Sequence, residues 1–361
     1  MHKEMISDKQ KIASIILFLV GSTSIFAPGL EAKKDAWLAF FLAIIIVLPL
    51  VNIFARLHHI FPDKDLFDMF EICFGKFIGK GIIIVFIWYT FFWAADVLVN
   101  YGQFIRLVSL RNTSQIIPII VLCILCAWGI REGIEVLGRW GEFFFTIPII
   151  SIFALIALSI PNMNINNLLP VFYEGITPVL RGTFTAFETP LAQIVAFMAV
   201  FPSFHTRKSP YKVYTIGLLT GGLYMFLITL INLLVVGADF AAGSYYPSYD
   251  TASRIDVANI IQRIEVVISI TFVIGGFIKI SILLLCTCKG LTRLFGLKDY
   301  RSSVMPISLL AINLSYFLYD SKMHHMEFND EIWPYYFLPL QVFLPIILLI
   351  IGEIKKKRLS N

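Results

Sequence analysis

Three ionisable side chains lie inside apolar stretches of this sequence: Asp96, Glu188 and Lys279. An unpaired charge at the centre of a bilayer costs at least ~2.5 kcal/mol, so such residues face protein or a polar cavity and mark candidate functional sites. Lys279 needs an anion, and Asp96 and Glu188 are the mid-membrane candidates. The pattern predicts either a structural ion pair or a fixed cation in the place of a coupling ion.

Two further segments contain residues that interrupt a helix. The first consists of Gly21, Ser22, Thr23 and Ser24. Small hydroxyl residues beside glycine let a helix unwind and expose backbone groups to a ligand, but they also let two helices pack closely. The second consists of Phe187, Glu188, Thr189 and Pro190. Because the residue before a proline is pushed out of the α region, we expect a break or a kink there, beside an acid.

A polar stripe surrounds Asp96. It consists of Tyr89, Trp93, Asp96, Asn100 and Gln103. These residues follow one another at steps of three or four positions, so they share one helical face. This face is expected to meet protein rather than lipid, and Asp96 is either a buried ion-pair member or a protonatable ligand.

The composition indicates which elements position these residues. Of the 361 residues, 58% are hydrophobic and 15% are charged. A soluble core does not bury that apolar surplus, so we expect an all-α integral membrane protein and exclude disordered, collagen-like and nucleic-acid-binding chains. About 20 apolar residues are needed for a helix to cross the hydrocarbon layer. Ten stretches fit, at residues 12–30, 36–55, 82–105, 116–130, 143–160, 183–204, 213–238, 266–288, 304–319 and 335–352.

Positive charge in the loops predicts the orientation. With the N-terminus inside, the inner segments hold 20 of the 29 Lys and Arg residues, the outer segments hold eight, and Lys279 lies within a span. Because cations resist translocation, both termini are expected in the cytoplasm.

The ten spans divide into two halves of five, whose orientations are opposite because five is odd. The interruptions at 21–24 and 187–190 fall in the first span of each half, and matched interruptions point to a mid-membrane site in an inverted-repeat transporter. We therefore expect one polytopic membrane domain over residues 1–361, with broken helices 1 and 6. Its repeats would cover about 12–160 and about 183–352.

Two connecting segments are expected to be ordered. Residues 62–80 resemble an amphipathic helix at the membrane interface. Its apolar face would be formed by Leu66, Met69, Phe70 and Cys73. Residues 245–265, rich in tyrosine, are expected to form an outer loop with a short helix.

The sequence offers no constellation for enzymatic chemistry. It contains no nucleophile, histidine and acid set, no glycine-rich phosphate loop, and no His or Cys cluster with metal-ligand spacing. The six His residues fall at span ends or in loops, and Cys123 and Cys126 lack the strand-turn-helix setting of a redox pair. We expect neither an enzyme nor a metal or cofactor.

Short strings in the loops carry a family resemblance. They are ISDKQ from Ile6, KDAW from Lys34, NINNLLPV from Asn164, YYPSY from Tyr245, QRIE from Gln262 and LKDYR from Leu297. Jointly, and in order along nearly the whole chain, they resemble the spore germination permease family. Members of that family are the B subunits of nutrient germinant receptors in endospore-forming bacteria. The family is in turn similar to the amino acid–polyamine–organocation superfamily, whose fold is leucine-transporter-like.

The resemblance implies a membrane subunit that detects a small germinant, such as an amino acid, a sugar or a nucleoside. It also implies an A-type membrane protein and a C-type lipoprotein as partners in the spore's inner membrane. By superfamily analogy, both broken segments line the pocket and the third span lies opposite. The implied substrate-binding residues are Gly21, Ser22, Thr23, Ser24, Asp96, Asn100, Phe187, Glu188, Thr189 and Pro190. Asp96, Glu188 and Lys279 are the implied charge pair or coupling group.

Three functions remain open at this stage. The first is a germinant sensor, with an amino acid as the expected nutrient, in which ligand binding shifts a transporter-like equilibrium. The second is a proton-coupled amino acid permease, in which Asp96 or Glu188 exchanges a proton with each substrate. The third is a structural scaffold of the receptor complex, which needs no pocket.

Overall fold

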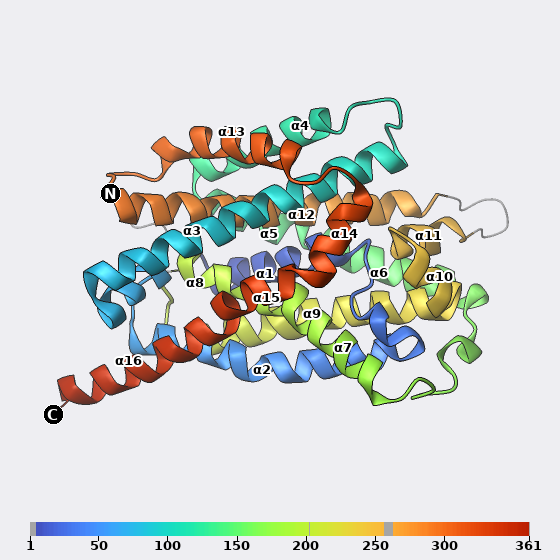
Figure 1. The fold of residues 1–361 in the computed structure, drawn as a ribbon, viewed down its shortest axis with the longest axis horizontal. Helices are drawn as coiled ribbons and strands as arrows, with labels where there is room; N and C mark the ends of the chain where they lie inside the picture. Colours follow the sequence, from blue (N-terminus) through green and yellow to red (C-terminus); the bar gives the residue numbers. More distant parts are fainter. Residues whose placement is uncertain (1–4, 202, 256–262, 361) are drawn as a thin grey trace.

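The computed structural model of the chain describes residues 5–201, 203–255 and 263–360. Its regular elements are helices, and the long ones run side by side along one axis of the molecule (Figure 1). The helices are α1 (Asp8–Thr23), α2 (Ala36–Ile60), α3 (Leu66–Val108), α4 (Ile116–Glu132), α5 (Ile134–Phe144), α6 (Thr146–Ser159), α7 (Ile176–Ala186), α8 (Phe197–Val200), α9 (Ser209–Val236), α10 (Ala238–Gly243), α11 (Pro247–Ser253), α12 (Glu265–Phe295), α13 (Arg301–Phe317), α14 (Lys322–Glu331), α15 (Trp333–Leu338) and α16 (Leu344–Ser360).

Shorter 3₁₀ or π-helical segments connect some of these helices. They are η1 (Leu30–Asp35), η2 (Ile160–Asn162), η3 (Ile165–Leu168), η4 (Phe187–Leu191), η5 (Ala192–Ala196) and η6 (Pro339–Phe343). Segments η4 and η5 join α7 to α8, and η6 joins α15 to α16.

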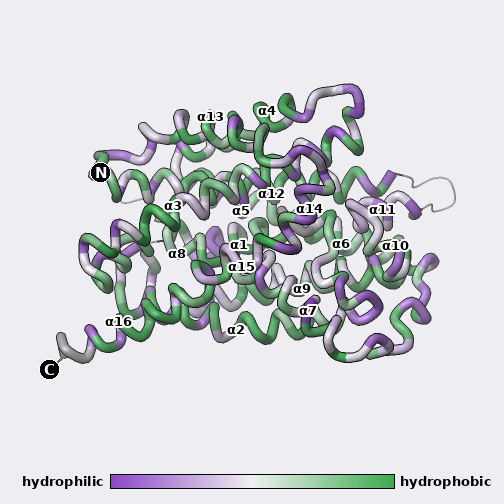
Figure 2. Tube along the Cα trace, in the orientation of Figure 1, coloured by the Kyte–Doolittle hydropathy of each residue, from purple (hydrophilic) through white to green (hydrophobic). Residues whose placement is uncertain are grey.

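The apolar helices agree with a membrane-spanning bundle. Within the described residues, seven helical segments are long and apolar enough to cross a membrane, or eight if the bent pair α13 and α14 forms one span. Helices α1, α4 and α13 have 16, 17 and 17 residues and occupy three of the places where the sequence predicts spans. In Figure 2 the long helices are mostly hydrophobic, and hydrophilic residues gather in the turns and around α14.

The first helix shows how the sequence determines an element boundary. Ser7 precedes α1, and its hydroxyl accepts a hydrogen bond from the backbone N–H of Gln10 at 3.2 Å. The Gln10 side chain accepts in return from the backbone N–H of Ser7 at 3.1 Å. This capping box satisfies two backbone donors that the first helical turn leaves unpaired, and it fixes where α1 begins.

The predicted interfacial segment and the third span form one long element. Helix α3 has 43 residues, and its helical geometry is interrupted at Gly75, which has φ 81° and ψ 168°. Glycine tolerates this left-handed φ because it has no Cβ. The predicted apolar face of the first part, Leu66, Met69, Phe70 and Cys73, is buried as expected.

Helices α1 and α12 cross in close contact at the centre of the bundle. A Cβ atom added to Gly21 would lie 2.1 Å from the backbone carbon of Gly275. The small residues of α1 therefore serve helix packing at this point. Helix α1 stays helical through Thr23, and its break begins at Ser24, the last residue of the predicted segment.

The second predicted break lies where the sequence places it. Helix α7 ends at Ala186, and within η4 the backbone of Thr189 leaves the helical region with φ −122° and ψ 111°. A third break was not expected. Helix α14 is bent by 105° from α13 and crosses over the long helices (Figure 1).

Contacts between distant segments define the two ends of the bundle. At one end, the Lys11 ammonium at the start of α1 donates to the carbonyl of Ser203 at 2.7 Å. Arg56, at the end of α2, pairs there with Glu353 of α16 at 2.5 Å. At the opposite end, Lys33 of η1 pairs with Glu174 at 2.6 Å. Helix α11 provides the short helix predicted within 245–265, of which residues 256–262 lie outside the described part.

Candidate ligand-binding site

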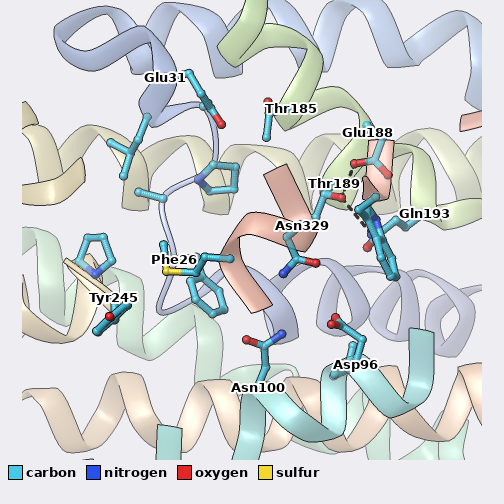
Figure 3. Close-up of a pocket in the computed structure, with 18 of the residues that line it drawn as sticks. Phe26, Glu31, Asp96, Asn100, Thr185, Glu188, Thr189, Gln193, Tyr245 and Asn329 are labelled. Carbon is cyan, nitrogen blue, oxygen red and sulfur yellow. Dashed lines mark hydrogen bonds between the residues drawn. The ribbon is translucent and has the colours of Figure 1, made fainter. Parts of the chain in front are cut away.

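The central cavity of the bundle is lined by the chain after α1, by α3, by α7 with η4 and η5, by α10 to α11, by α12 and by α14 to α15. Its volume is about 430 Å³, within the usual range of small-molecule sites. Figure 3 shows polar side chains from α3, from η4 and from α14 converging on it. Both breaks, in α1 and between α7 and α8, therefore border one cavity.

Asp96 faces this cavity from α3 with an oriented carboxylate (Figure 3). Its Oδ1 atom accepts a hydrogen bond from the Tyr319 hydroxyl at 2.9 Å and lies 2.8 Å from Nε2 of His325. Both contacts use the same oxygen, and among the described residues the Oδ2 atom has no hydrogen-bond partner. The arrangement leaves Oδ2 available to a cationic group in the cavity.

His325 joins α14 to the polar stripe of α3. The imidazole is fully buried, and its Nδ1 atom lies 3.2 Å from Oε1 of Gln103. Its Nε2 atom, besides contacting Asp96, lies 3.4 Å from Nδ2 of Asn100. Three stripe residues thus meet one side chain, which confirms that the stripe faces protein.

Glu188 lies at the break between α7 and α8. Its Oε2 atom accepts a hydrogen bond from the Thr189 hydroxyl at 2.5 Å (Figure 3). Its Oε1 atom lies 3.5 Å from Nε2 of Gln341 in η6, and the same amide contacts the Tyr89 hydroxyl at 3.2 Å. Glu188 therefore belongs to a buried network that connects η4, η6 and α3, and such networks depend on all of their partners being in place.

Lys279 projects from α12 into the centre of the bundle. Its ammonium donates to Oε1 of Gln193 at 2.8 Å and lies 4.9 Å and 4.7 Å from the ring centroids of Phe18 and Trp93. Asp96 and Glu188 line the same cavity as Lys279. The ion pair or coupling role of these three residues stays a prediction.

A second cation lines the cavity from α14. The Lys322 ammonium donates to Oδ1 of Asn100 at 3.2 Å. It also lies 5.6 Å from the ring centroids of both Phe26 and Tyr246. Positive and negative groups therefore face the same cavity.

The structure brings together some of the predicted site residues. Asp96, Asn100, Glu188, Thr189 and Lys279 all line the cavity.

Other predicted site residues lie beside the cavity lining. Phe187 and Pro190 belong to the η4 break but are not among the lining residues. Gly21 packs on α12, and Ser24 is fully buried. The side chains of Ser22 and Thr23 lie outside the described part of the chain. In the chain that follows α1, residues 26–31 line the cavity.

Sequence reasoning missed the contribution of α14. His325 and Lys322 belong to a polar stretch between the predicted ninth and tenth spans, so they were assigned to a loop. The spacing of Lys322, His325, Met326 and Asn329 is i, i+3, i+4 and i+7, and it was the available signal for a helix with one inward face.

The arrangement is an all-helical, transporter-like membrane fold. The sequence model of a family described as "Spore germination protein" matches residues 5–323, and the chain belongs to this family. "Spore germination protein KB" of Bacillus subtilis (strain 168) is 30% identical over 99% of this chain and 97% of its own length. "Spore germination protein B2" of the same organism is 23% identical over 94% of this chain and 95% of its own length.

Solved structures support the fold. The nucleobase-cation-symport-1 family transporter Mhp1, in a closed conformation with bromovinylhydantoin bound, aligns over 93% of this chain and 76% of its own, with a TM-score of 0.61 and 12% identity. MhsT in complex with L-phenylalanine aligns over 93% of this chain and 87% of its own, with a TM-score of 0.60 and 15% identity. The family and the fold together support a germinant receptor or permease-like role and confirm the resemblance seen in the loops.

Proposed function

We propose that this chain is the nutrient-sensing B subunit of a spore germinant receptor, and that the central cavity binds the nutrient. It would act in the spore's inner membrane together with an A-type membrane subunit and a C-type lipoprotein. The family supports the receptor, and the cavity between the two broken helices supports the binding role. The observation on which the proposal rests is the Asp96 carboxylate, which lines the cavity and whose hydrogen bonds to Tyr319 and His325 use only Oδ1.

The charge pattern of the cavity favours an amino acid as the nutrient. An α-amino acid carries an ammonium and a carboxylate a few ångströms apart. Oδ2 of Asp96 is placed to accept from the ammonium, and Lys322, one helical turn from His325 on α14, is placed to receive the carboxylate. A cavity of about 430 Å³ leaves room for a side chain beside Trp93 and Trp333.

Binding would be transmitted through α14. Lys322 and Met326 face the cavity from this helix, while His325 attaches it to α3. A ligand that contacts both α3 and α14 stabilises the arrangement in which they are close, and it shifts the receptor by its difference in affinity for the two states.

The test uses spores that lack their other nutrient receptors and carry this chain with its own A and C partners. Asp96→Asn keeps the shape of the side chain but removes the charge, so we expect the half-maximal concentration of the effective amino acid to rise about tenfold or more. Glu188→Gln is expected to change the potency or the identity of the effective nutrient. The control is Asp320→Asn, because that side chain is 97% exposed. Unchanged responses in both cavity variants, at normal subunit levels, would exclude the cavity as the nutrient site.

A proton-coupled permease is the second candidate, because the carboxyl groups of Glu31, Asp96 and Glu188 line the same cavity in a transporter-like fold. It differs from the sensor in needing no partner. The purified chain in liposomes, with a pH gradient as the driving force, would accumulate radiolabelled amino acids if it were a permease. A scaffold would show neither uptake nor any change of nutrient specificity in the cavity variants.

A further inference from the structure

A second cavity lies at the end of the bundle where α1 begins and α16 ends. It has a volume of about 670 Å³ and lies between the first part of α3, the last turns of α12 and the turn into α13. Its basic lining residues are Lys76, Lys80, Lys289 and Arg293. Since it lies at the ends of membrane helices, it is at the depth of the lipid headgroups.

The acids of this groove are already paired within the protein. Arg293 contacts Glu71 at 2.5 Å, and Asp299 contacts Arg301 at 3.3 Å. Asp65 accepts from the backbone N–H of Asp68 at 2.9 Å and so caps the start of α3. Contacts within the protein therefore already balance most of the negative charge of these acids.

Lys76 and Lys80 differ from these acids in their surroundings. Lys76 and Lys80 are exposed, and in the part of the chain that the structure describes neither forms an ion pair. They are four residues apart in a helix and therefore lie on the same face. Lys289 contributes a third ammonium, which donates to the carbonyl of Val200 at 3.3 Å. The groove thus presents net positive charge toward the membrane surface.

Large apolar side chains stand beside these lysines. Phe77 lies next to Lys76 and is 93% exposed, and Ile78 and Phe295 are also exposed. Aromatic and aliphatic side chains next to lysines at a helix end are typical of segments that insert into the boundary between headgroups and acyl chains. A ligand with an anionic head and an apolar tail matches both parts of this surface.

We propose that the groove formed by Lys76, Lys80 and Lys289 binds the phosphate headgroup of an anionic phospholipid, whose acyl chains pack beside Phe77 and Phe295. The lysines supply the point charges that phosphate requires, and basic pockets between membrane helices bind such headgroups. Because Lys289 also holds the end of α8, the bound lipid connects α3, α8 and α12 at this end of the bundle. The proposal is independent of the identity of the nutrient.

Lipid binding to the purified full-length chain tests the proposal. Native mass spectrometry would count bound phosphatidylglycerol as it is titrated into the detergent-solubilised protein, with phosphatidylcholine as the neutral lipid. Near a membrane surface each lysine contributes about 1 kcal/mol, so the double variant K76Q/K80Q is expected to weaken phosphatidylglycerol binding roughly 30-fold. The matched control, K208Q/K212Q, removes two exposed lysines near the same end of the bundle.

Each other outcome overturns the proposal. Equal binding of both lipids by the unmodified chain would exclude recognition of the anionic headgroup. An equal loss in K76Q/K80Q and K208Q/K212Q would show a diffuse effect of surface charge. Displacement of phosphatidylglycerol by millimolar inorganic phosphate, with equal protection of the protein against thermal unfolding, would show a site for a soluble anion instead.

Discussion

At the scale of single residues, the Asp96 carboxylate divides its two oxygens between protein and cavity. Tyr319 and His325 both contact Oδ1. The protein has already fixed the orientation of this carboxylate. Ligand binding therefore costs little further side-chain entropy at Asp96. The affinity of the site is therefore expected to depend on residues that need not touch the nutrient.

This dependence predicts the effect of His325→Ala. The change leaves Oδ1 of Asp96 with one partner and frees α14 from Gln103, so we expect the half-maximal nutrient concentration to rise by about tenfold or more. His325→Gln retains a donor and is expected to recover part of the loss. Dose-response curves of germination, with subunit levels measured in parallel, provide the readout.

The neighbouring histidine is a matched control. His324 is half-exposed and lies 3.7 Å from the exposed carboxylate of Asp320. His324→Ala should leave the response unchanged. Equal responses of the two alanine variants would contradict a positioning role for His325.

The residue scale also shows what the sequence does and does not reveal. Asp96, Glu188 and Lys279 are recognisable because a charge inside an apolar membrane span is energetically costly and therefore marks a candidate functional residue. His325 is not recognisable because it lies in a polar stretch, and Gln341 is not because an uncharged amide within a predicted span does not indicate its partner. Their roles depend on contacts with α3, more than 200 positions away in the sequence.

At the scale of elements, the crossing of α1 and α12 allows almost no substitution. Gly21 and Gly275 place the two backbones in direct contact. Gly21→Ala must push the helices apart, and we expect it to destabilise the protein by about 1–3 kcal/mol and to lower its thermal stability in detergent.

Gly243→Ala is the corresponding control. A Cβ added at Gly243 would meet no atom within 4 Å. This variant should unfold at the temperature of the unmodified chain. A Gly21→Ala protein with unchanged thermal stability would show that the two helices can move apart without loss of stability.

Lys11 forms a second contact between elements, at the end of the bundle opposite η1. The Lys11 ammonium binds the carbonyl of Ser203 and lies 4.2 Å from the ring centroid of Phe204. Lys11→Met removes both interactions. A cysteine placed at the buried Val200 is then expected to react faster with a water-soluble thiol reagent, whereas the exposed Lys9→Met should not change the rate.

Element boundaries were predictable where a local cause determines them. The Thr189-Pro190 step marks the break after α7 in the sequence itself, and the structure has its break there. The break in α1 lies later than predicted because close packing keeps Gly21 helical. Helix α14 was missed because its burial comes from α3, and local polarity alone resembles a loop.

At the scale of the whole molecule, the loop charges predict the orientation in the membrane. Both termini are expected in the cytoplasm, and the division into repeats of about 12–160 and 183–352 stays a prediction. The fold class itself followed from composition and from the two matched interruptions, and the solved transporters confirm it.

The orientation is testable with single introduced cysteines. Ser253 and Lys298 are exposed, and they follow α11 and α12 at opposite ends of the bundle. A membrane-impermeant thiol reagent applied to intact cells should label Ser253→Cys and not Lys298→Cys. The reverse pattern would place the termini outside.

The sharp turn between α13 and α14 has a mechanical consequence. With ten residues, α14 is about 15 Å long, and it leaves α13 at 105°. His325 holds the start of α14 against Asp96, and the far end of this helix is the exposed Glu331. The helix is therefore a lever. A neighbouring subunit that contacts its far end would detect occupancy of the cavity as a displacement of that end, without contacting the nutrient.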